Sequence, residues 1–163
     1  MQRTNNESGL TAGKNYKFAA TSYIWPADIL TNVEKLKDYV QGVQLVLFEL
    51  PEESNLPNNI EIDKLNKLKA EFNLSYFIHL PLNLDIFNAA KFVEDAGKFI
   101  NAGKSIGAEY NVMHLNLPDK YSKYEYCADL PVNELKKFYK VGQSALSKLS
   151  GKFPECGIIE TTL

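Results

Sequence analysis

Hydrophobic and polar positions follow two alternating patterns along the chain. Short runs that are apolar almost throughout are followed by longer stretches in which apolar residues recur every three or four positions. The short runs are typical of strands buried on both faces of a parallel sheet, and the longer stretches are typical of amphipathic helices. The predicted strands are 16–24, 43–50, 75–82, 108–117 and 157–163, and the predicted helices are 27–40, 62–72, 88–106 and 131–149.

Glycine and proline mark several of the breaks between these elements. Gly42 is predicted to end the first helix and Gly107 the third, because glycine is favoured just past a helix C-terminus. Pro81 is expected to end the third strand, since proline cannot donate to a strand ladder. Residues 51–59 and 118–129 are rich in proline or polar residues and are expected to be loops.

The alternation of strand and helix predicts a single α/β domain with parallel strands and right-handed crossovers. Residues 1–15 are expected to be a flexible polar tail, and residues 16–163 to form the domain. Two architectures fit: the N-terminal portion of a (β/α)8 TIM barrel, or a five-stranded flavodoxin-like sheet. A complete barrel has eight strands and typically about 250 residues, so the first architecture implies C-terminal truncation. It is favoured because no predicted helix follows 157–163 to cover the last strand.

Composition and charge limit the possible function classes. The 163 residues are 45% hydrophobic and 23% charged, with a net charge of −2, as in ordinary soluble globular proteins. This balance does not support nucleic-acid binding, which needs a basic face. No apolar run reaches the roughly 20 residues of a membrane span, and the N-terminus is too polar for a signal peptide. We therefore expect a cytoplasmic protein without a membrane partner, with Cys127 and Cys156 as free thiols.

Polar side chains fall near the ends of otherwise apolar strands. In α/β sheets and barrels, functional residues collect at the carboxyl ends of the strands. In chain order, the strand-end residues are Thr21, Ser22, Tyr23, Glu49, His79, His114 and Glu160. Burying carboxylates or imidazoles is costly unless they are paired or bind a metal. The pattern therefore predicts a functional site at one rim of the sheet.

A metal site is the most specific form of this prediction. His79 and His114 are the only histidines in the chain, and together with Glu160 they would provide two imidazoles and a carboxylate. Such ligands suit zinc, manganese or iron, and the metal would polarise a phosphoryl or carbonyl oxygen or generate hydroxide near neutral pH. The alternative for each histidine is a hydrogen-bonded core residue. Glu49 is either a catalytic carboxylate or a residue that anchors a loop or pairs with a neighbouring side chain.

Other motifs are absent or weak. The sequence has no Gly-x-Gly-x-x-Gly, no complete Gly-x-x-x-x-Gly-Lys-Ser/Thr phosphate loop and no Gly-x-Ser-x-Gly, which disfavours dinucleotide-binding, P-loop and serine-hydrolase classes. Tyr121, Tyr124 and Tyr126 either line a ligand mouth or pack within their loop. Lys120 and Lys123 beside them make a small basic spot of the kind common on solvated surfaces.

Three strand motifs resemble the xylose-isomerase-like barrel superfamily. They are Ile-His-Leu-Pro-Leu at 78–82, Val-Met-His-Leu at 112–115 and Ile-Ile-Glu-Thr at 158–161. That superfamily, also called the AP endonuclease family 2 superfamily, includes sugar isomerases, epimerases and abasic-site nucleases. Its members are (β/α)8 barrels that bind divalent metals through His, Glu and Asp at strand ends. The resemblance implies that His79, His114 and Glu160 are metal ligands.

A narrower resemblance is to the cobamide-remodelling subgroup of bacterial phosphodiesterases. It rests on Thr-Ser-Tyr-Ile-x-Pro at 21–26, Leu-Val-Leu-Phe-Glu at 45–49, Ser-Asn-Leu-Pro at 54–57 and His-Leu-Pro-Leu at 79–82. Those enzymes hydrolyse the phosphoribosyl linkage of a corrinoid's nucleotide loop. The resemblance runs from about residue 18 to residue 163.

The resemblance implies a metal-dependent phosphodiesterase whose small-molecule substrate is a corrinoid. Its catalytic residues would be Glu160 and Glu49, and the substrate pocket would be shaped by Thr21, Ser22, Tyr23 and Asn55. One alternative is a sugar phosphate isomerase or epimerase, in which a metal-bound hydroxy-ketone loses a proton to a carboxylate. The other is an inactive truncated barrel that associates through its open edges.

Overall fold

The computed structural model describes residues 17–117, 121 and 129–162, without the side chains of residues 159–162. Within these residues, five strands alternate with four helices. They are β1 (Ala19–Thr21), α1 (Ile29–Leu36), β2 (Gly42–Val46), α2 (Asn59–Phe72), β3 (Ser75–His79), α3 (Ala89–Ser105), β4 (Tyr110–Leu115), α4 (Val132–Lys152) and β5 (Gly157–Thr162). The predictions for the tail at 1–15 and for Lys120, Lys123, Tyr124, Tyr126 and Cys127 lie outside the described residues.

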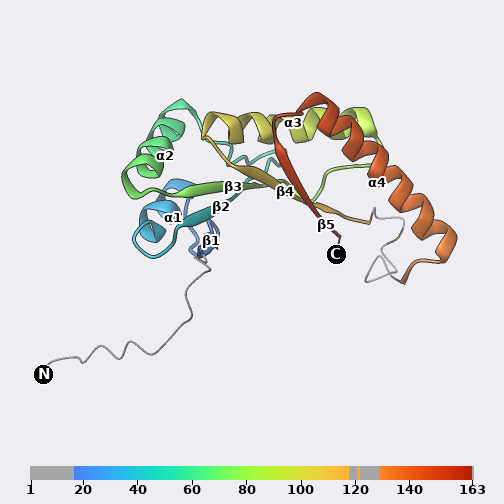
Figure 1. Ribbon diagram of the computed structural model, residues 1–163, viewed down its shortest axis with the longest axis horizontal. Coiled ribbons are helices and arrows are strands. Elements are labelled where there is room, and N and C mark those ends of the chain that lie inside the picture. The colour runs from blue at the N-terminus through green and yellow to red at the C-terminus, as the bar shows by residue number, and fades with distance from the viewer. Residues whose placement is uncertain (1–16, 118–120, 122–128, 163) are drawn as a thin grey trace, which may run out of the picture.

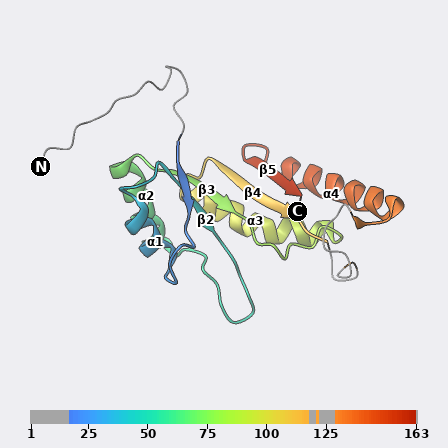
Figure 2. The same cartoon turned by 90° about the horizontal axis from the view of Figure 1, so that it is seen from below.

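The strands form one parallel sheet in the order β1-β2-β3-β4-β5. Each strand pairs with the next one in the sequence, so β1 and β5 lie at opposite ends of the sheet (Figure 2). A flavodoxin-like sheet has the order 2-1-3-4-5, so that alternative is wrong. Consecutive parallel strands joined by right-handed crossovers place their helices on one side, as in a TIM barrel. The predicted partial barrel is confirmed, and Figure 1 shows α3 and α4 along one side of the strands.

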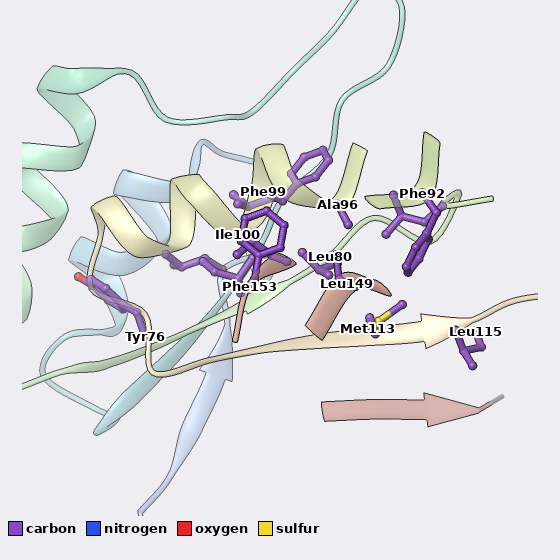
Figure 3. Packing of buried hydrophobic residues seen from close by; sticks show 14 of the residues in the cluster. Tyr76, Leu80, Phe92, Ala96, Phe99, Ile100, Met113, Leu115, Leu149 and Phe153 are labelled. Carbon is purple, nitrogen blue, oxygen red and sulfur yellow. The ribbon is translucent and has the colours of Figure 1, made fainter. Parts of the chain in front are cut away.

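The hydrophobic core lies on the helix-covered face of the sheet. On β3, Tyr76 and Ile78 are fully buried, whereas the alternating residues Phe77 and His79 are only half-buried. The same alternation occurs on β4, and Figure 3 shows the buried Met113 of that strand directed toward the helices. One face of the sheet therefore packs against the helices, and the other face carries the half-buried side chains.

We call this second face the open face. Its half-buried residues on β2, β3 and β4 are Gln44, Val46, Phe77, His79, Tyr110, Val112 and His114. The rings of Phe77 and Tyr110 stack there, with their centroids 4.3 Å apart. Gly42 is the first residue of β2 and lies beside the Phe77 ring. The prediction that it ends the first helix is therefore wrong. The position needs glycine for a different reason, because a Cβ there would lie 2.9 Å from the Phe77 ring.

The ends of several elements differ from the sequence prediction. α2 begins three residues earlier, because Asn58 and Glu61 form a reciprocal capping box at its N-terminus. β2 ends at Val46, so Glu49 lies in the loop beyond it. Gly107 has φ +64 and follows α3, which confirms its predicted role at that helix end.

None of the helices in the described part of the chain is both long and apolar enough to cross a membrane.

Candidate metal centre at the carboxyl rim

The structure brings the two histidines together at the carboxyl ends of adjacent strands. His79 is the last residue of β3, and the register pairs it with Val112 of β4. His114 lies two residues beyond Val112 and therefore on the same open face. The two Nε2 atoms are 3.0 Å apart, and the ring centroids are 4.9 Å apart with an interplanar angle of 44°. The sequence predicts both side chains at one rim of the sheet, and the structure places them next to each other there.

A backbone hydrogen bond determines which nitrogen of His79 carries the proton. Nδ1 of His79 lies 2.8 Å from the carbonyl oxygen of Leu80. A carbonyl oxygen can only accept, so Nδ1 is the donor and Nε2 of the neutral ring keeps its lone pair. Burial lowers the pKa of His79, and the nearby His114 acts in the same direction. His79 therefore presents a neutral Nε2 to its partner, which is the form that a metal ligand must have.

The spacing of the histidine pair fits a shared metal ion. Two nitrogen ligands about 2.1 Å from one ion, at angles between octahedral and tetrahedral, lie about 3.0–3.4 Å apart. The observed 3.0 Å separation falls at the lower end of that range, and it is also the length of a hydrogen bond between the two nitrogens, the alternative role expected for each histidine. Metal-binding histidines usually donate their other N–H to a carbonyl or carboxylate, as His79 does. Among the described residues, no group of three His, Cys, Asp or Glu side chains is close enough to hold an ion.

Glu160 is the third predicted ligand. The register pairs Glu160 of β5 with Met113 of β4, and pairs Thr161 with His114. The backbone of Glu160 therefore lies on the strand next to His114, one residue before the position directly opposite it. The side chain of Glu160 is outside the described atoms, so its roles as metal ligand and catalytic carboxylate stay predictions.

Glu49 has a partner on a helix. It lies beyond β2, where its backbone forms an isolated antiparallel bridge with Ser54. Its carboxylate is 2.7 Å from Nζ of Lys98 on α3, and this hydrogen bond raises the pKa of Lys98. The contact joins the β2–α2 loop to α3 across 49 residues of sequence. Pairing with a nearby side chain was one of the two expected roles of Glu49, and its catalytic role stays a prediction.

Ser22 and Asn55 use their polar atoms to continue the hydrogen bonding of β2. The Ser22 hydroxyl accepts from the backbone N–H of Val46 at 3.0 Å. Oδ1 of Asn55 accepts from the N–H of Phe48 at 2.7 Å, and its Nδ2 donates to the carbonyl of Val46 at 2.8 Å. Both side chains thus hold the chain in place just past the end of the strand. Their predicted contact with substrate stays a prediction.

Three of the four predicted substrate-binding residues line one cavity. Ser22, Tyr23 and Asn55 border a cavity of about 740 Å³ between the β1–α1 and β2–α2 loops. Tyr23 is 72% exposed and lies at its edge. Thr21 is the last residue of β1 and pairs in register with Gln44, whose side chain lies on the open face. The β1–α1 and β2–α2 loops, which are about 30 residues apart in the sequence, therefore lie side by side at the rim.

Asn32 is an important rim residue that sequence analysis missed. It is fully buried on α1, where its Oδ1 accepts from the N–H of Trp25 at 3.0 Å. Its Nδ2 donates to the carbonyls of Trp25, Ala27 and Asp28. Asn32 therefore holds the β1–α1 loop in place through hydrogen bonds to the backbone of that loop. The signal in the sequence is a polar residue three positions after Ile29, on the apolar stripe of a helix.

Comparison with known proteins supports the fold. No model of a known protein family matches the sequence, and no curated protein does. A solved structure of a D-tagatose 3-epimerase-like protein matches with a TM-score of 0.64 and 18% identity, covering 90% of this chain and 52% of that one. The AsfvAP:AG crystal structure matches with a TM-score of 0.55 and 11% identity, covering 88% and 46%.

The chain has the fold of a partial TIM barrel. It spans about half the length of these two solved structures. At these identities the likeness shows the fold alone and assigns no activity. The likeness to an epimerase-like protein agrees with the expected xylose-isomerase-like barrel at the level of architecture. Neither likeness bears on the corrinoid subgroup.

Proposed function

We propose that the chain carries the metal-binding rim of a TIM-barrel enzyme that acts on a sugar-bearing small molecule. The observation that carries this proposal is the histidine pair, with two Nε2 atoms 3.0 Å apart at the ends of adjacent strands. TIM-barrel enzymes place their active sites at this end of the barrel. The pair also lies on the open face, which in a complete barrel is the interior.

The residues of the rim have distinct roles in this proposal. His79 and His114 hold a divalent ion through Nε2, and Glu160 adds a carboxylate. The Leu80 carbonyl fixes the His79 ring, so the lone pair is presented without reorganisation. A bound divalent metal supplies Lewis acidity and stabilises negative charge on a substrate oxygen. The Glu49–Lys98 pair holds the neighbouring loop against α3 and so shapes the rim.

The first candidate reaction is sugar isomerisation or epimerisation. The fold likeness to a D-tagatose 3-epimerase-like protein favours it. In such a reaction a carboxylate removes the proton from the carbon next to a ketose carbonyl, and the proton then returns to the substrate. Glu160 is the carboxylate that the sequence pattern assigns to this step; its backbone lies on the strand beside His114, in register with Met113.

The second candidate reaction is hydrolysis of the phosphoribosyl linkage of a corrinoid. The sequence motifs at 21–26 and 54–57 favour it, because they resemble those of the corrinoid subgroup. A metal centre suits this chemistry as well, since it activates water and stabilises charge on phosphoryl oxygens. The substrate in both candidates contains a sugar ring with hydroxyl groups.

Metal binding is the first test of the proposal. Calorimetric titration with zinc, manganese and iron(II) would compare the wild-type chain with His79→Gln, His114→Gln and the control Gln44→Ala. We expect each histidine variant to weaken binding at least about tenfold, because removing even an outer-shell partner costs about 10–100-fold. Gln44 lies on the same open face but outside the pair, so its removal should leave the affinity unchanged. A folded wild-type chain that takes up none of these metals would contradict the proposal.

Product analysis then separates the two reactions. The metal-loaded chain would be incubated with ketohexoses, with epimers detected by NMR, and with a cobamide under reducing conditions, with released nucleoside detected by chromatography. Epimer formation that disappears in His114→Gln would assign the first reaction. Nucleoside release with the same dependence would assign the second. Product in neither assay from metal-loaded protein would contradict an enzymatic role for this chain.

A further inference from the structure

The cavity between the β1–α1 and β2–α2 loops has the dimensions of a small-molecule site. Its volume is about 740 Å³, and the N-terminal parts of α1 and α2 form two of its walls. Ligand sites typically have volumes of about 300–1,000 Å³ and combine apolar walls with a few polar groups. The histidine pair contributes no atom to the lining of this cavity.

The inner wall of the cavity is apolar and reaches the hydrophobic core. Ile29 of α1 and Leu65 of α2 both line it, and both are buried core residues with 9% and 1% exposure. Pro26, Phe48 and Leu56 add further apolar surface from the two loops. An apolar body placed here would lose water from its own surface, which favours binding.

The polar groups around the cavity disfavour an anion. Both helices begin at its border, but several of their first backbone N–H groups already have capping partners. Asp28 accepts from the N–H of Thr31, and Asn58 accepts from the N–H groups of Ile60 and Glu61. These are the donors through which a helix N-terminus would bind a phosphate or carboxylate. The carboxylates of Asp28 and Glu61, which also border the cavity, add negative charge instead.

Tyr23, Leu50 and Glu53 are among the exposed residues that line the cavity, and we call these three its mouth. Among the described residues, neither the Glu53 carboxylate nor the Tyr23 hydroxyl has a hydrogen-bond or ion-pair partner. Three carboxylates line the cavity, those of Asp28, Glu53 and Glu61, and none of the described Lys, Arg or His residues does, so its charge favours a cation. The mouth is therefore complementary to a cation, and the interior to an apolar group.

We propose that this cavity binds a small organic cation with a flat apolar body, such as an aromatic amine. The ring lies against Pro26, Phe48 and Leu56, and the ammonium group faces Glu53 and Tyr23 at the mouth. The proposal does not depend on the metal-binding function proposed for the histidine pair.

Three probes with one ring system and different charges test it. Tryptamine is a cation, indole is neutral and indole-3-acetate is an anion, and each would be titrated into the ¹⁵N-labelled chain and followed by NMR. We expect shifts concentrated at the cavity residues, with tryptamine binding about two- to fivefold more tightly than indole, as for an exposed ion pair. Indole-3-acetate should bind most weakly.

Variants identify the groups responsible. Glu53→Gln should remove the advantage of tryptamine over indole while leaving indole affinity unchanged. Glu34→Gln is the matched control, because Glu34 is an exposed carboxylate on α1 outside the cavity lining. Tyr23→Ala should weaken all three probes. His114→Gln should weaken metal binding but retain tryptamine binding, which separates this proposal from the metal centre.

Several results would overturn the inference. One is the absence of localised shifts with all three probes, and another is equal binding of tryptamine and indole-3-acetate. A Glu53→Gln variant that still prefers tryptamine would remove the assigned cation partner. Loss of tryptamine binding in a folded His114→Gln variant would show that the cavity is not a separate site.

Discussion

At the residue scale, Asn32 determines the conformation of the β1–α1 loop. Its buried amide makes one accepted and three donated hydrogen bonds to the backbone around Trp25. Asn32→Ala would leave these groups without their partner, and each buried unsatisfied group costs about 1–3 kcal/mol. We expect this variant to lose about 2 kcal/mol of unfolding free energy in a urea titration followed by circular dichroism.

A second asparagine provides the control for that measurement. Asn101 is exposed on α3, and its replacement by alanine should change the unfolding free energy by less than about 0.5 kcal/mol. If Asn32→Ala were equally neutral, the hydrogen bonds to the loop would not contribute to stability.

Single residues also show where sequence analysis succeeds at the site and where it fails. The meeting of His79 and His114 was predictable, because carboxyl ends of parallel strands share one rim. The Glu49–Lys98 pair was not, since it joins residues 49 positions apart on a loop and a helix. The proton position on His79 depends on the Leu80 carbonyl, which only coordinates reveal.

At the scale of elements, Asp28 stabilises the start of α1. Its carboxylate accepts from the N–H of Thr31 at 2.7 Å and from the Thr31 hydroxyl at 2.9 Å. These hydrogen bonds lower the pKa of Asp28, so its contribution is present above about pH 4 and is lost as the pH falls through the lowered pKa. We expect Asp28→Ala to cost about 1 kcal/mol at pH 7, measured by urea unfolding.

The pH dependence of this cap distinguishes charge from hydrogen bonding. Asp28→Asn keeps an acceptor oxygen but cannot titrate, so the stability difference between wild type and Asp28→Asn should shrink as the pH is lowered from 6 toward 3. A difference that is constant over this range would show that the charge of Asp28 does not contribute.

Two helical glycines should respond in opposite ways to the same substitution. In α3, a Cβ at Gly103 would lie 2.6 Å from Cγ1 of Ile78, so Gly103→Ala overpacks the helix–sheet contact. We expect a loss of about 1–3 kcal/mol of unfolding free energy. In α4, Gly151 has nothing within 4 Å of that position, so Gly151→Ala should stabilise by about 0.5 kcal/mol through helix propensity. Thermal unfolding of both variants tests this, and a shift of the same sign in both would contradict it.

The order and type of all nine described elements followed from hydrophobic periodicity, but their ends did not. β2 stops at Val46 because side chains of Ser22 and Asn55 take over its hydrogen bonding. α2 starts at Asn59 because of its capping box. Gly42 had a packing role against Phe77 that no helix-end rule describes. Element ends thus depend on individual side-chain contacts, whereas element type depends on a pattern repeated over many residues.

At the scale of the whole molecule, the order of the strands decides the architecture. Periodicity is the same for a partial barrel and a flavodoxin-like sheet, so the sequence pattern alone left both open. The observed order places the strand ends with Ser22, His79 and His114 along one rim, and leaves one face of the sheet outside the core. The proposed metal centre lies on that open face.

The open face and the sheet edges predict self-association. Within the described residues, β1 and β5 each pair with one strand only, and the open face carries half-buried Phe77, Tyr110 and Val112. Free strand edges and apolar surface both favour contact with a second copy. We expect the sedimentation coefficient of the purified chain to rise with protein concentration.

Two lysine substitutions locate the surface responsible for that association. Val112→Lys places a charge on the open face and should shift association to higher concentration. Ile60→Lys is the control, because Ile60 is 68% exposed on α2, on the helix side of the sheet. If the sedimentation coefficient stayed constant, or if both variants reduced association equally, the open face would not be the contact. Association that Val112→Lys alone weakens would show that the face carrying the histidine pair becomes covered when two copies meet, so metal uptake should then fall as protein concentration rises.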